Sequence, residues 1–236
     1  MSTFLQRALI LVFFFTLSSS GLVAQQTWAR FHGANGSGVS MDSTLPSSWT
    51  DSDYVWQVDL LGVGSGSPVI WGDRIFLTSS DPQTAELTVL CLSTDDGQQL
   101  WQKKFESSKY HHHRKNNFAS STLAADQQQI YVAYANEQHT WLVALSHEGE
   151  EKWKRDFGPY FSSHGFSSSP IVYQDKVILV NSQQAEKLKP GQQPGVAESF
   201  RSALPMAVMF GRPLWKQRAC ATAYLAFTGP PTETTS

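Results

Sequence analysis

Residues 67–79 read SPVIWGDRIFLTS, and this stretch decides the fold because the chain repeats it. A close copy, SPIVYQDKVILVN, occupies residues 169–181, and a looser copy, STLAADQQQIYVA, lies between them at residues 121–133. The copies start 54 and then 48 residues apart. Each copy predicts a short apolar strand, a tight turn and a second strand rich in β-branched residues, which together form a β-hairpin.

A second element follows the first two copies in the same order. Residues 90–101 read LCLSTDDGQQLW, and residues 143–153 read VALSHEGEEKW. In both, a glycine precedes a tryptophan by four residues, and these pairs are Gly97 with Trp101 and Gly149 with Trp153. Two hairpins per unit make a four-stranded antiparallel sheet, and units of about 50 residues that cannot bury both faces alone stack radially in β-propellers. We expect the two tryptophans to pack between neighbouring blades.

The strands of these units carry apolar side chains that are expected to fill the space between blades. The candidates are Leu77, Leu90, Leu92, Ile130, Val132, Leu142, Leu145, Ile178 and Val180. Residues 53–59, DYVWQVD, alternate in polarity before the first blade. This alternation predicts a lone outer strand, which in a closed propeller can complete the last blade.

These elements are similar to the repeats of the pyrroloquinoline quinone-like β-propeller family. Residues 28–40, WARFHGANGSGVS, and residues 45–49, LPSSW, resemble the start of mature exported members of that group. The resemblance covers about residues 28–183 and implies an all-β, quinoprotein-like partial propeller of about three four-stranded antiparallel blades. Because about four blades are the fewest that close a ring, the chain resembles a truncated member with an incomplete ring.

The same family includes quinone-dependent alcohol dehydrogenases, propeller lipoproteins of outer-membrane protein assembly, and exported proteins without an assigned activity. Its enzymes typically have a vicinal cysteine pair, calcium ligands and eight blades, and none of these can be matched in this sequence. We therefore assign no catalytic and no quinone-binding residue, and the resemblance alone implies pyrroloquinoline quinone as a cofactor. Two functions stay open: a non-catalytic binding or scaffold module that holds a protein or small ligand at its blade tips, and the N-terminal fragment of a quinone-dependent periplasmic dehydrogenase.

The first 24 residues have the pattern of a signal peptide. Arg7 precedes the apolar run of residues 8–17, and serines and a small residue, Ala24, follow it. The run is shorter than the ~18 residues that a membrane span needs, so we expect cleavage and export to the periplasm or the medium. The predicted organisation is a signal peptide in residues 1–24, an N-terminal loop segment in 25–52, propeller blades in 53–195 and an atypical tail in 196–236.

The composition excludes several classes of protein. The 236 residues are 41% hydrophobic and 16% charged, which is too apolar for a disordered chain. The net charge of −2 gives no basic surplus for neutralising phosphates, so nucleic acid is not an expected partner. The two cysteines, Cys91 and Cys220, are too few for a disulfide framework.

Three consecutive histidines occupy residues 111–113, and imidazoles are common ligands of zinc and copper. Neighbouring side chains of an extended segment point to opposite faces, so only His111 and His113 could converge on a metal ion. We favour the alternative, a solvated loop between blades. The ligand surface is expected at the polar blade tips, namely Gly66 and Ser67, Ser167 to Ser169, and the loops 109–117 and 162–166.

Beyond residue 183 the repeat pattern breaks down. Gly211 and Trp215 keep the four-residue spacing, but Pro213 between them would interrupt an outer strand. We interpret the last 40 or so residues as lying outside the propeller pattern, after an interruption of the natural chain or reading frame near Val196. An incomplete ring leaves blade edges exposed, which predicts self-association.

Overall fold

The computed structural model describes residues 27–40, 46–184 and 220–228. The predicted signal peptide lies outside these residues, as do residues 185–219 and 229–236 of the C-terminal stretch. The predictions made for those segments therefore stay predictions. Within the described part of the chain, no helix is long and apolar enough to cross a membrane.

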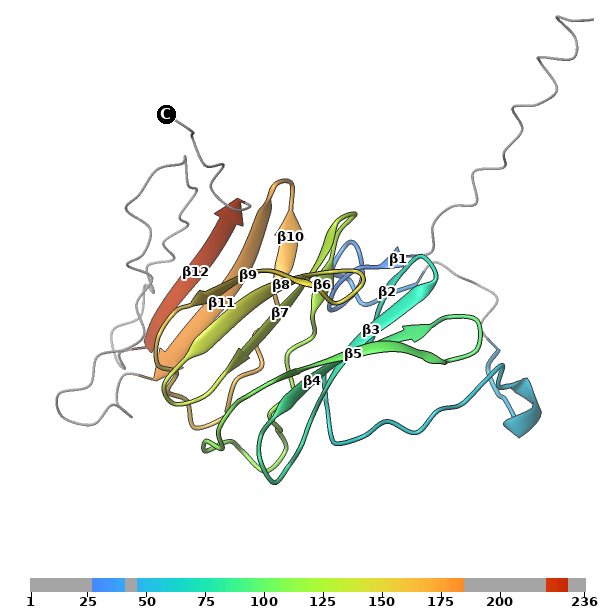
Figure 1. Cartoon of the computed structure of the whole chain (residues 1–236), viewed down its shortest axis with the longest axis horizontal. Coiled ribbons are helices and arrows are strands. Elements are labelled where there is room, and N and C mark those ends of the chain that lie inside the picture. The colour runs from blue at the N-terminus through green and yellow to red at the C-terminus, as the bar shows by residue number, and fades with distance from the viewer. Residues whose placement is uncertain (1–26, 41–45, 185–219, 229–236) are drawn as a thin grey trace, which may run out of the picture.

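Three antiparallel sheets follow one another along the chain (Figure 1). The first sheet has the order β1 (Thr27–Trp28), β2 (Val69–Trp71), β3 (Arg74–Ser80), β4 (Leu87–Ser93) and β5 (Gln99–Phe105). The second has the order β6 (Ala124–Ala125), β7 (Gln129–Ala135), β8 (Thr140–Ser146) and β9 (Glu151–Asp156). The third has the order β10 (Ile171–Tyr173), β11 (Lys176–Gln184) and β12 (Cys220–Thr228). A short helix, η1 (Asp51–Asp53), precedes the first blade.

This architecture confirms the predicted fold class, an all-β partial propeller of about three blades. The sequence explains the inner hairpin of each blade, because a two-residue turn joins two strands of alternating side chains. At the first turn Gly72 has a φ of 63°, and Trp71 lies opposite Arg74. At the corresponding turn of the third blade Gln174 has a φ of 54°, a left-handed conformation that glycine adopts more readily.

The hydrophobic core lies between the blades, as radial stacking requires. One cluster joins the first blade to the second and includes Phe76, Val89, Ile130 and Val143, while another joins the second blade to the third. Seven of the nine predicted core residues are buried, but Ile178 and Val180 are only half-buried. Side chains alternate between the two faces of β11, and the face that carries Val177 and Leu179 is the buried one. The prediction that Ile178 and Val180 fill the core is therefore wrong.

Three features of the fold differ from the sequence-based expectations. Residues 54–59 form no strand, although an outer strand is predicted there. The first blade has a fifth strand, β1, which pairs with β2 through Trp28 opposite Ile70. The third blade has β12, which pairs with β11 and lies inside the segment that the sequence analysis assigns to the tail.

Candidate functional site

Two loops that are far apart in the sequence meet at one end of the blades. We call residues 109–117 and 162–166 the tip loops. The His113 amide donates to the carbonyl of His164 at 3.3 Å, and the Asn116 side-chain amide donates to the same carbonyl at 2.7 Å. At Gly165 an added Cβ would lie 2.6 Å from the Cβ of His112, so only glycine allows this approach. The tip loops that the sequence predicts as one surface are thus in direct contact.

Aromatic rings pack against one another within and beside the tip loops. The Tyr110 and Phe118 rings meet at 5.2 Å in an edge-on arrangement, and the His112 ring meets Phe118 at 4.8 Å. The Phe166 amide donates to the Tyr110 hydroxyl at 3.4 Å. Burial raises the pKa of Tyr110 to about 12, although this hydrogen bond opposes the shift. Tyr110 is therefore a neutral, structural phenol at physiological pH.

The metal site considered from the sequence would bring His111 and His113 together, whereas in the structure the His113 ring lies beside that of His164. His111 and His113 are both exposed, and the ring beside His113 is that of His164, at 5.9 Å. Within the described residues, no group of three or more histidine, cysteine, aspartate or glutamate side chains is arranged to hold a metal ion. The neighbour of His113 lies in a loop about 50 residues further along the chain, and the spacing of residues in the sequence does not predict such a contact.

The hydroxyl groups near the inner strands bind neighbouring blades together. The Ser67 amide donates to the Thr122 hydroxyl at 2.8 Å, and the Thr122 amide donates to the Ser169 hydroxyl at 3.0 Å. The Ser121 hydroxyl also donates to the carbonyl of Ser168, at 2.8 Å. These equivalent positions of three successive blades thus form a ladder of hydrogen bonds that fixes the blades and the loops they carry.

A tryptophan and a glycine turn make a second repeated contact between units. The Trp101 indole donates to the carbonyl of His147 at 2.8 Å, and a Cβ at Gly149 would lie 3.0 Å from that ring. Trp56 makes the same contact one unit earlier, because its indole donates to the carbonyl of Thr94 at 2.8 Å and its ring lies over Gly97. The structure thus places Trp101, Gly149 and Gly97 at these junctions, and it adds Trp56, which lies in a segment that the sequence predicts to be a strand.

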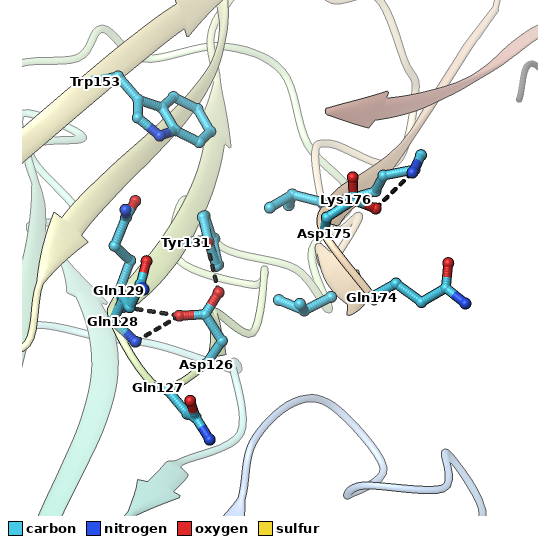
Figure 2. Close-up of a pocket in the computed structure, with 11 residues that line it drawn as sticks. Asp126, Gln127, Gln128, Gln129, Tyr131, Trp153, Gln174, Asp175 and Lys176 are labelled. Atoms are coloured by element: carbon cyan, nitrogen blue, oxygen red, sulfur yellow. Dashed lines mark hydrogen bonds and ion pairs between the residues drawn. The ribbon is translucent and has the colours of Figure 1, made fainter. Parts of the chain in front are cut away.

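Trp153, at the equivalent position of the second blade, lines a pocket of about 440 Å³ between the second and third blades. Figure 2 shows Asp126, Tyr131 and Trp153 on one side of this pocket and Gln174 to Lys176 on the other. The Asp126 carboxylate accepts hydrogen bonds from the Tyr131 hydroxyl and from two backbone amides (Figure 2). We call this space the Trp153 pocket.

Comparison with known proteins places these features in a family. Residues 49–192, more than half of the chain, match the family described as outer membrane protein assembly factor BamB. Among solved structures, the chain is similar to BamB from Moraxella catarrhalis, with 18% identity and a TM-score of 0.39. This alignment covers 53% of the present chain and 36% of that BamB chain. None of the curated proteins matches the chain.

Proposed function

Because the chain belongs to the family of pyrroloquinoline quinone-type propeller repeats described as outer membrane protein assembly factor BamB, we propose that it is a binding or scaffold module of the cell envelope. In this role the blades carry no chemistry of their own. They hold the tip loops in a fixed arrangement against a protein partner. The predicted signal peptide in residues 1–24 supports export of the chain to the compartment in which such a partner is assembled.

The fixed and basic tip loops are the observation that carries this proposal. The hydrogen-bond ladder through Thr122 and the contact between His113 and His164 hold the loops in place. Lys109, Arg114 and Lys115 are all exposed on the first loop. A preorganised surface loses little conformational entropy when it binds, and a basic one attracts an acidic partner and increases the association rate. We therefore propose that the tip loops bind an acidic protein surface.

Binding can be measured with the mature chain, residues 25–236, and purified outer-membrane protein assembly machinery that lacks its own propeller subunit. We expect saturable binding that weakens at high salt, because the screening length falls to roughly 3 Å at 1 M salt. The double variant Arg114→Ser/Lys115→Ser is expected to weaken binding about tenfold at low salt.

The matched control is Lys104→Ser/Lys152→Ser, which removes the same charge from the outer strands β5 and β9. Lys104 forms an ion pair with Glu86, and Lys152 forms one with Glu150. The control variant is expected to bind as the natural chain does. Equal losses for the two double variants would show that net charge alone matters, and an absence of saturable binding would contradict the proposed function itself.

A further inference from the structure

A hydrogen bond inside the first tip loop, residues 109–117, depends on the protonation state of His113. The Lys115 amide donates to the Nδ1 atom of the His113 ring at 3.3 Å. A backbone amide can only donate, so this nitrogen carries no proton and the imidazole is neutral, with its proton on Nε2. Within the part of the chain that the structure describes, no metal-holding group includes His113, so the Nδ1 lone pair serves the Lys115 amide alone.

Elsewhere in the described chain, turns of this kind use a side-chain oxygen as the acceptor. Asn117 accepts from the amide of Ala119, and Asn136 accepts from the amide of Gln138, both at 2.9 Å. Asparagine and aspartate favour turns because their side chains accept from the backbone two residues further on. An amide oxygen stays an acceptor at every physiological pH, whereas an imidazole takes up a proton around pH 6.5 and then has no free lone pair. His113 therefore makes its turn sensitive to protons.

The other histidine rings that form hydrogen bonds among the described residues act as donors. His112 donates to the carbonyl of His113, His139 to the carboxylate of Asp156, and His147 to the carbonyl of Asp126. A ring nitrogen that donates to an oxygen still donates once the ring is protonated. Of these four ring hydrogen bonds, only the one at His113 is lost when the ring gains a proton.

The turn that His113 closes also holds the second tip loop, residues 162–166. The Asn116 amide donates to the His113 carbonyl at 2.8 Å and completes the turn. The Asn116 side chain donates to the carbonyl of His164 at 2.7 Å, and the His113 amide reaches the same carbonyl at 3.3 Å. Opening of the turn at residues 113–116 therefore displaces the groups that join the two loops.

Protonation of His113 also adds a positive charge where no negative charge compensates it. The His113 ring lies 5.9 Å from the His164 ring, and neither tip loop contains an aspartate or a glutamate. The charged and titratable groups of the two loops around His113 are Lys109, Tyr110, His111, His112, Arg114, Lys115 and His164. All of these except the phenol are positive in acid, and like charges disfavour one another.

We propose that His113 is a proton switch of the tip loops, whose neutral ring closes the turn at residues 113–116 and whose protonated ring opens it. Histidine is suited to this role because its charge changes in the physiological range. For its consequence the inference rests on the proposed function, in which the tip loops bind a protein partner. An open turn has to be ordered again before it binds, so binding is weaker in acid than at neutral pH.

Amide hydrogen exchange of the free mature chain, followed by NMR, tests the switch without a partner. The chemical exchange rate at each pH, divided by the observed rate, gives a protection factor. For the Lys115 and Asn116 amides we expect this factor to fall at least about fivefold from pH 7.5 to pH 5.5, as the loss of one hydrogen bond predicts.

Two variants of the same loop make this measurement specific. His113→Asn supplies an acceptor that does not titrate, and it is expected to keep the protection at both pH values. His111→Asn removes an exposed imidazole from the same loop and is the matched control, which keeps the loss in acid. A protection factor that is constant in the natural chain, or that falls equally in His113→Asn, would overturn the proposal.

Binding to the purified outer-membrane protein assembly machinery that lacks its own propeller subunit tests the consequence. The ratio of the dissociation constants of the natural chain and His113→Asn removes the titration of the partner and of the other histidines. We expect a ratio near one at pH 7.5 and of about three or more at pH 5.5. A ratio of one at both pH values would overturn the control of binding. Saturable binding by neither chain would contradict the proposed function, while exchange in the free chain still decides whether the switch exists.

Discussion

Gly149 shows how one residue determines the contact between two blades. Its φ is 88°, and an added Cβ would lie 3.0 Å from the Trp101 ring. Gly149→Val therefore strains the backbone and displaces the indole, and we expect a loss of about 1–3 kcal/mol in the free energy of unfolding. Urea unfolding measures this loss. Glu150→Val, at the exposed neighbouring position, is expected to change stability by less than about 0.5 kcal/mol, and equal effects of the two changes would contradict the role of the glycine.

Cys91 is buried in the first blade, and its chemistry follows from that position. Burial raises the pKa of its thiol to about 12, and the nearby Arg74 charge opposes the shift only in part. Because an unfolded thiol has a pKa of about 8.5, Cys91 stabilises the fold fully below that pH, and this contribution is lost as the pH rises toward 12.

A thiol reagent tests this in the variant Cys220→Ser, where Cys91 is the only cysteine. At pH 8 we expect Cys91 to react at least about a hundredfold more slowly in the folded chain than in urea, because both the thiolate form and solvent access are suppressed. Labelling at the same rate in both conditions would show that the thiol is accessible in the folded protein.

At the scale of the strands, the hydrogen-bond ladder between blades is the feature to test. Thr122→Val keeps the shape of the side chain but removes the hydroxyl that accepts from the Ser67 amide. An unsatisfied buried amide costs about 1–3 kcal/mol, so we expect a loss of this size in the free energy of unfolding. Thr88→Val on β4 is the matched control, because Thr88 is half-buried on its strand and is expected to tolerate the change. Equal stability of the two variants would show that the ladder contributes nothing.

The strands that the sequence predicts well are those whose pattern is local. The hairpins at residues 67–79 and 169–181 combine alternation with a turn, and both are present as β2 with β3 and β10 with β11. Residues 54–59 also alternate, but Trp56 binds a glycine turn that lies about 40 residues further on, and the segment forms no strand. Alternation predicts a half-buried extended segment and does not identify its neighbour.

The candidate site was predictable only in part, for the same reason. The polar composition of the tip loops singles them out as surface segments, but no sequence pattern places His113 beside His164 or Trp153 across a pocket from Lys176. Those contacts depend on how far one blade is rotated relative to the next. The spacing of the repeats predicts that the blades stack, and the structure is needed to show which loops then meet.

At the scale of the whole molecule, an exposed apolar segment precedes β2. Residues 54–63 touch the first blade through the Trp56 indole, which donates to the carbonyl of Thr94, and through Val63, which bridges to Ser80. Within the segment, Val55 is 88% exposed and Leu61 is 82% exposed. Apolar side chains gathered on one exposed segment favour association, since burying them against a second copy removes them from water. We therefore expect the mature chain to self-associate, in line with the sequence-based prediction for an incomplete ring.

Sedimentation velocity over a range of concentrations measures this association. We expect Val55→Ser/Leu61→Ser to shift the protein toward the monomer, because the two side chains together present the largest exposed apolar surface of the segment. Leu100→Ser/Tyr173→Ser is the matched control, since these residues are 46% and 61% exposed but belong to the strands β5 and β10 and not to the segment. A control that dissociates the protein equally would place the contact at the blade edges, and a mature chain that is monomeric at every concentration would contradict self-association altogether.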